Sequence, residues 1–331
     1  MTVFFQGAEL QDFPVKVGNV SHSTNAGSYN ASNARCSINV AGAAEGTNYL
    51  ETSTYSSAEL WFHALVNFGS TTPFNLNFLK WYSGGAERLA LRFSQSSPAR
   101  LEIRKLDGTY SSLGVSGDVT IGAAQSFKLD ILVKLGNPGS VRVYLDNIPV
   151  IANDAANLTW SGVSVLDKMR LGNIDTSMSS GAVRWSEIIV ADWNTINSKL
   201  VTRIPNANGT YSEWSGAGYT ALNELTPAAT YMTSGTADQR VSVGLTSFPA
   251  LAGGERIERV QVAANALRDA SGPQKENIFY RVAGADNHRS DRTLTVSAAD
   301  YTEAWDMSPA TSTYWTPTEL NASEPGMRSR A

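Results

Sequence analysis

The sequence predicts an all-β chain of two β-sandwich domains with one short helix near the C-terminus. Short apolar segments are separated by turn residues, and their apolar and polar side chains alternate with a period of two. In residues 127–135, for example, Phe127 and Leu129 alternate with Lys128 and Asp130. A strand with one buried and one solvated face requires this alternation, and no helical periodicity competes with it over the first 196 residues.

The first predicted domain spans residues 1–196. After the strand at 127–135, the turn Gly136–Gly139 leads into a second alternating segment at 141–146, which predicts a hairpin. The same alternation predicts further strands at 89–93 and 100–104, and a last strand is predicted at 183–193. Many short strands joined by Gly, Asn and Asp turns indicate a sandwich or jelly roll.

A polar, turn-rich segment at 197–210 predicts a linker, and the second domain follows at 211–331. This domain again reads as β, with predicted strands at 257–266, 278–282 and 294–296. Neither half visibly repeats the other.

The helix signal lies close to the C-terminus. Thr316 and Glu319 have the spacing of a capping box, and Pro317 occupies the first helical position. We expect one or two helical turns, which Pro325 and Gly326 end.

Composition excludes several classes of function. The chain has 331 residues, 42% of them hydrophobic, and a net charge of −4 without a dense basic patch, so we expect no nucleic-acid partner. No apolar run reaches the roughly 20 residues of a membrane helix, so no membrane insertion is expected. The N-terminal residues lack the basic and apolar regions of a signal peptide. The single Cys36 excludes an internal disulfide framework.

The first half resembles a concanavalin A-like, or laminin G-like, lectin and glucanase jelly roll. The residues that carry this resemblance are the early core strand at 58–65, the hairpin at 129–146 and the closing strand at 183–193. The resemblance implies a jelly roll for the first domain.

The second half resembles a C-terminal module of structural proteins from tailed bacteriophages. It is carried by the order of four segments: 257–262, 306–311, 315–321 and 324–327. The resemblance implies a virion component, either a tail-tip or fibre protein or a head-decoration protein. It also implies a location in the virion and partners among other virion proteins and copies of the chain itself, in a homo-oligomer such as a trimer. On this reading the chain is not an enzyme.

An alternative function is a carbohydrate-binding adhesin that contacts host surface glycans. Aromatic rings hold sugars by stacking against their apolar faces. Trp81 and Tyr82 precede the loop-like Ser83-Gly84-Gly85, and Trp160 lies between polar segments. These three side chains are the predicted glycan contacts.

Calcium is the one cofactor that the sequence leaves open. Asp146, Asp154 and Asp175 offer hard oxygen ligands in predicted turns, as lectin relatives do. Asx residues also populate turns for local hydrogen-bonding reasons, and this second explanation is the commoner one.

Glycan hydrolysis is the least favoured hypothesis. A retaining hydrolase needs two carboxyl groups about 5 Å apart, which residues i and i+2 of one strand would supply. The closing strand carries only Glu187 and Asp192, and their odd separation sends them to opposite faces of a regular strand. We therefore predict no catalytic residue.

Overall fold

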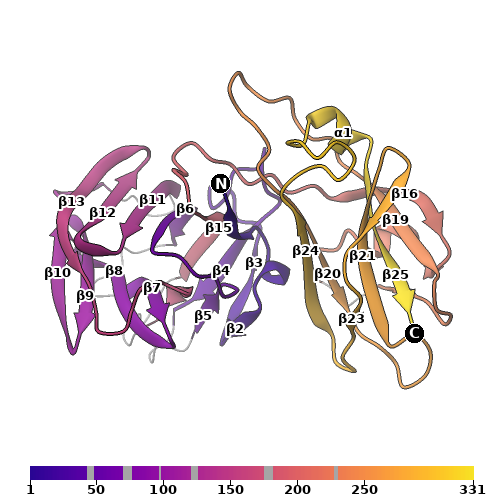
Figure 1. The fold of residues 1–331 in the computed structure, drawn as a ribbon, viewed down its shortest axis with the longest axis horizontal. Coiled ribbons are helices and arrows are strands. Elements are labelled where there is room, and N and C mark those ends of the chain that lie inside the picture. Colours follow the sequence, from indigo (N-terminus) through magenta and orange to yellow (C-terminus); the bar gives the residue numbers. More distant parts are fainter. Residues whose placement is uncertain (43–47, 70–76, 97, 121–125, 175–181, 227–229) are drawn as a thin grey trace. The chain divides into compact units, whose positions relative to one another are not determined.

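The computed structural model describes the chain except for residues 43–47, 70–76, 97, 121–125, 175–181 and 227–229. It divides into two compact units, Met1–Thr202 and Arg203–Ala331 (Figure 1). They are called unit 1 and unit 2 below, and each is described by itself.

Unit 1 is a sandwich of two antiparallel sheets. The first sheet has eight strands in the order β13-β12-β11-β6-β15-β4-β3, with β1 paired to β15. Its strands are β1 (Val3–Gly7), β3 (Val20–Ser23), β4 (Ser37–Ala41), β6 (Glu59–Phe68), β11 (Ser126–Lys134), β12 (Gly136–Leu145), β13 (Ile148–Leu158) and β15 (Ala182–Ala191).

The second sheet of unit 1 has seven strands in the order β10-β9-β8-β7-β14-β5-β2. Its strands are β2 (Val15–Val17), β5 (Asn48–Glu51), β7 (Asn77–Ser83), β8 (Ala86–Ser96), β9 (Ala99–Asp107), β10 (Thr109–Val115) and β14 (Lys168–Asn173). A single 3-10 turn, η1 (Leu10–Asp12), follows β1.

The core of unit 1 lies between the two sheets. The apolar set of each strand faces inward, as the alternation requires, so Leu129 and Ile131 of β11 are fully buried. Phe68 packs edge-on against Phe78 and Phe93, with ring centroids 5.2 and 5.0 Å away. Each such ring contributes roughly 1.5–3 kcal/mol through its burial.

Unit 2 is built on a six-stranded sheet, in the order β16-β19-β25-β21-β22 with β23 paired to β21, and on the two-stranded pair β20-β24. The larger sheet contains β16 (Pro205–Ser212), β19 (Arg240–Leu245), β21 (Lys275–Val282), β22 (Ala285–His288), β23 (Arg292–Thr293) and β25 (Glu324–Arg330). The remaining elements are β17 (Ser215–Gly216), η2 (Gly218–Ala221), β18 (Met232–Thr233), β20 (Val260–Ala266), β24 (Ala299–Trp305) and α1 (Pro317–Asn321).

The helix α1 begins as the sequence predicts. The Thr316 hydroxyl accepts a hydrogen bond from the Glu319 backbone N–H, and the Glu319 carboxylate accepts one from the Thr316 N–H at 3.0 Å. Leu320 packs into the core of unit 2 with Tyr280, Trp305 and Trp315. The predicted fold class, two β-sandwich domains with a short C-terminal helix, is confirmed.

The segment predicted as a linker, 197–210, is structured along much of its length. Thr202 donates its backbone N–H to the Asn33 carbonyl at 2.6 Å, and Leu200 packs on the outer face of the eight-stranded sheet. Strand β16 already begins at Pro205. The residues read as a polar connection therefore belong largely to the two units themselves.

No helix among the described residues has both the length and the apolar character needed to cross a membrane.

Candidate functional site

The outer face of the seven-stranded sheet of unit 1 carries a dense layer of charged and tyrosine side chains. We call this layer the polar face. Strand pairing places its members on the side of the sheet opposite the core, and they are Tyr49, Glu51, Asn77, Lys80, Tyr82, Glu87, Arg92, Glu102, Arg104, Tyr110, Lys168 and Arg170.

One row of paired positions crosses this face from β5 to β10. Glu51 pairs with Arg170, and Arg170 pairs in turn with Lys80 of β7. Lys80 pairs with Ala90 of β8, and Ala90 with Arg104 of β9. Since neighbouring strands lie about 4.8 Å apart, three basic side chains stand in one line within about 15 Å.

Glu51 fixes two of the basic side chains. Its carboxylate accepts hydrogen bonds from Arg170 Nε at 2.7 Å and from Lys168 Nζ at 3.0 Å. Burial would raise the pKa of Glu51, but the hydrogen bonds from Arg170 and Lys168 outweigh burial and hold that pKa below its ordinary value. The carboxylate therefore stays charged and keeps both cations in place.

A second group forms around Glu87. Lys80 Nζ lies 2.8 Å from the Glu87 carboxylate, which also accepts a hydrogen bond from the Tyr110 hydroxyl. Arg104 stacks on the Tyr110 ring, with Cζ 3.8 Å from the ring centroid, and donates to the Asn77 side-chain oxygen at 2.9 Å.

Glu102 and Arg92 form a further ion pair of the face, at 2.7 Å. The sequence leaves Glu102 alone between two arginines of its own strand. Its partner comes from β8, through a cross-strand pairing that the local pattern does not reveal.

Arginines also stack on the tyrosines at the other end of the row. Arg170 Cζ lies 4.4 Å from the Tyr49 ring centroid and 4.7 Å from that of Tyr82. The Tyr82 hydroxyl accepts a hydrogen bond from Arg170 Nη1 at 3.4 Å. Burial raises the pKa of Tyr82 although Arg170 and Lys80 act in the opposite direction, so the hydroxyl keeps its proton at neutral pH.

The structure separates the three predicted glycan contacts. Tyr82 lies on the polar face, but it is only 6% exposed, because Arg170 and Lys168 cover its ring. Trp81 is fully buried, because it pairs with Leu89 and Met169 on the core side of β7, so its prediction as a surface ring is corrected. Trp160 is 8% exposed, donates its indole N–H to the Leu106 carbonyl at 2.6 Å and is covered by Lys105, which corrects its expected loop exposure as well.

The predicted calcium ligands do not come together. Asp146, in the turn between β12 and β13, accepts the Lys128 backbone N–H at 2.9 Å. Asp154 forms an exposed ion pair with Arg142 at 2.7 Å, and Asp175 lies outside the described residues. Over the described parts of the chain, no group of three or more His, Cys, Asp or Glu side chains is arranged to hold a metal ion.

Glu187 lies in an irregularity of β15 rather than on a regular strand. The register shifts between Ser186 and Ile189, and Glu187 itself has φ of 54°. Its carboxylate is nearly buried and accepts a hydrogen bond from Asn33 Nδ2 at 3.1 Å, and burial raises its pKa. Asp192 instead accepts the Thr2 backbone N–H at 2.6 Å. The two carboxylates thus have separate structural partners.

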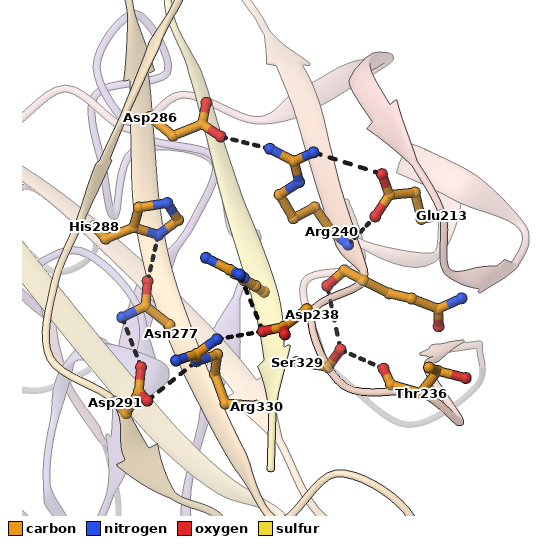
Figure 2. A network of polar contacts seen from close by, with 12 residues as sticks. Glu213, Thr236, Asp238, Arg240, Asn277, Asp286, His288, Asp291, Ser329 and Arg330 are labelled. Carbon is orange, nitrogen blue, oxygen red and sulfur yellow. Dashed lines mark hydrogen bonds and ion pairs between the residues drawn. The ribbon is translucent and has the colours of Figure 1, made fainter.

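The outer face of the large sheet of unit 2 carries a second charged layer, shown in Figure 2. Asp238 binds Arg328 at 3.0 Å and also binds Arg330, and Asp286 binds Arg240 and Arg281, each at 3.0 Å. The layer extends from Arg330 through Asp291 and Asn277 to His288. We call it the unit 2 network.

Comparisons with known proteins give matches among solved structures alone. No family model matches, and no curated protein matches. The chain is similar to an endo-β-1,4-glucuronan lyase from the fungus Trichoderma reesei, with a TM-score of 0.46 and 11% identity over 58% of this chain and 96% of that one. It is similar to the alginate lyase Aly36B, with a TM-score of 0.37 and 11% identity over 60% and 95%. It is also similar to the cellulose-induced protein Cip1, with a TM-score of 0.41 and 13% identity over 57% and 92%.

These likenesses are too distant to carry an argument about the activity of this chain. They do correct our expectation, drawn from the phage resemblance, that the chain is not an enzyme, because the matched structures include polysaccharide lyases. The virion role and location stay predictions, since none of the structures named here is a virion protein.

Proposed function

We propose that unit 1 binds a glycan on the polar face. The observation that carries this proposal is a group of tyrosines on one sheet face, set among charged hydrogen-bonding side chains: the half-buried rings of Tyr49 and Tyr110 and the nearly buried Tyr82. Tyrosine offers an apolar ring for the sugar face and a hydroxyl for its polar edge. The surrounding Lys and Arg side chains donate hydrogen bonds to sugar oxygens.

Pre-organisation supports the proposal. Tyr110 and Tyr49 each have an arginine stacked on the ring, and Glu51 and Glu87 hold the nearby cations by ion pairs. Side chains fixed in this way lose little conformational entropy when a ligand binds.

Native electrophoresis of the purified chain in gels that contain different polysaccharides tests the proposal. We expect at least one polysaccharide to slow the migration of the chain, and we expect this retention to be lost in the variant Tyr49→Ala/Tyr110→Ala. Tyr211→Ala is the matched control, because Tyr211 of unit 2 also lies under an arginine, Arg240, at 3.8 Å. Equal retention of both variants would overturn the proposal, provided that circular dichroism shows both to be folded.

Cleavage of the bound glycan is a second candidate function, and the environment of Tyr82 favours it. Its hydroxyl accepts a hydrogen bond from Arg170, and Lys168 Nζ lies 5.7 Å from its ring centroid. Burial keeps the hydroxyl protonated, as a proton donor to a departing sugar oxygen requires. We expect Tyr82→Phe to abolish the release of shorter chains while binding persists. Cleavage at the wild-type rate by Tyr82→Phe would remove this candidate.

A further inference from the structure

We infer that the glycan held by unit 1 is anionic and carries a carboxylate on its sugar ring. This inference rests on the proposed function and names its ligand class. Two features of the polar face support it: an excess of positive charge and the row in which three of the cations stand.

The polar face has more positive than negative charge. Among the described residues, its basic side chains are Lys80, Arg92, Arg104, Lys168 and Arg170, and its acidic ones are Glu51, Glu87 and Glu102. Arg100, on the same side of β9, is paired with the exposed Asp118 and is left out of this count. Five cations therefore face three carboxylates, an excess of two, on a chain whose net charge is −4. The excess is a local feature of this face.

The cations are also shielded from water. Lys80 is 5% exposed, and the side chain of Arg170 is 28% exposed. A neutral sugar bound on this face would displace the remaining water from the cations without supplying a negative charge, so the cations would lose hydration free energy. A carboxylate offsets that loss with charge-assisted hydrogen bonds.

The cations can engage more than one acidic group at a time. An arginine carries five N–H donors in a fixed fork, and a lysine carries three, so an ion pair with one carboxylate uses only part of either set. Arg170, Lys80 and Arg104 stand in one row across the strands. A chain with a carboxylate on successive sugars would meet one cation after another along that row.

The experiment compares matched pairs of polysaccharides. Alginate, polygalacturonate and glucuronan are each measured beside the same polymer after chemical reduction of its carboxyl groups, by calorimetric titration of the full chain. We expect at least one acidic polymer to bind about tenfold more tightly than its reduced form. Arg104→Gln and Lys168→Gln should each lower that affinity by about tenfold, and Arg142→Gln, an exposed residue of the other sheet, should not.

The outcomes separate the two proposals. Equal binding of the acidic and reduced forms would overturn the carboxylate inference and leave glycan binding in place. Binding of sulfated glycans in preference to every uronate polymer would also overturn it. If neither these polymers nor a panel of neutral glycans binds, the proposed function itself fails. Thermal unfolding of each variant shows whether it is folded.

Discussion

The two units carry the same kind of surface with different charge balance. In both, arginines, carboxylates and a stacked tyrosine cover the outer face of an antiparallel sheet. In the unit 2 network four arginines, Arg240, Arg281, Arg328 and Arg330, face four carboxylates, Glu213, Asp238, Asp286 and Asp291. The polar face of unit 1 instead has five cations and three carboxylates.

Charge balance separates a structural network from a binding face. The unit 2 network closes on itself and fastens the last strand of the chain, since Arg328 and Arg330 belong to β25 and bind Asp238 just before β19. The polar face holds its cations in place but does not neutralise them. Changes in unit 2 should therefore alter stability, and changes in the polar face should alter ligand affinity.

The largest expected effect concerns a carboxylate on the core side of the same unit 2 sheet. Glu276 is 1% exposed, and neither of its oxygens has a hydrogen-bond partner among the described residues. Burial raises the pKa of Glu276 from 4.5 to about 7. The charge of Arg292 lowers this pKa and that of Glu303 raises it, but burial has the largest effect. Glu276→Gln should stabilise unit 2 by about 3 kcal/mol at pH 8, measured by calorimetric unfolding.

The sign of the pH dependence follows from that pKa. Between pH 4.5 and about 7 the folded chain holds a proton on Glu276 that the unfolded chain has lost. The free energy of unfolding therefore falls as the pH rises through this window, and it levels off above it. Glu276→Gln should remove that slope. Parallel pH curves for the wild type and the variant would refute this account of unit 2.

The next largest effect concerns Asp286. Asp286→Asn removes the charge that holds Arg240 and Arg281, and should lower the stability of unit 2 by about 2 kcal/mol with no change in glycan affinity. Asp154→Asn is the control, because the exposed pair of Asp154 with Arg142 should leave the melting temperature unchanged. A fall in glycan affinity for Asp286→Asn would break the division of roles between the units.

Salt should weaken binding to the polar face by several-fold. Raising the ionic strength from about 0.05 to about 0.5 M screens the attraction between the excess cations and an acidic glycan. Calorimetric titration at the two salt concentrations measures this change. An affinity for the acidic glycan that is independent of salt would show that the charge excess plays no part in binding.

The smallest expected effect is that of Arg104→Lys. This change keeps the positive charge and removes the planar fork that stacks on Tyr110. Affinity for the acidic glycan should fall only about threefold, against about tenfold for Arg104→Gln. Equal losses in the two variants would show that Arg104 acts through its shape rather than its charge.

Local patterns predicted the strands and the helix, and the same patterns failed to predict the site. The alternation in 127–146 gave the hairpin of β11 and β12, and Thr316 with Glu319 gave the start of α1. These features depend on neighbours a few residues away, which the sequence displays directly.

The polar face depends on pairings between distant segments. Arg170, Lys80 and Arg104 meet because β14, β7, β8 and β9 are adjacent in the sheet, an order that no local pattern states. Trp81 and Tyr82 occupy successive positions of one strand, so one must face the core, and the sequence did not say which. The repeated i, i+2 spacing of Lys80 with Tyr82 and of Lys168 with Arg170 was the signal available for a common outer face.

Hydrogen–deuterium exchange of the full chain, with and without the acidic polysaccharide that binds best, shows directly where the glycan lies. Glycan binding on the polar face predicts slower exchange in peptides from β5, β7, β9 and β14 and unchanged exchange in unit 2. Slower exchange confined to unit 2, or to the eight-stranded sheet of unit 1, would contradict the assignment of the polar face as the glycan site.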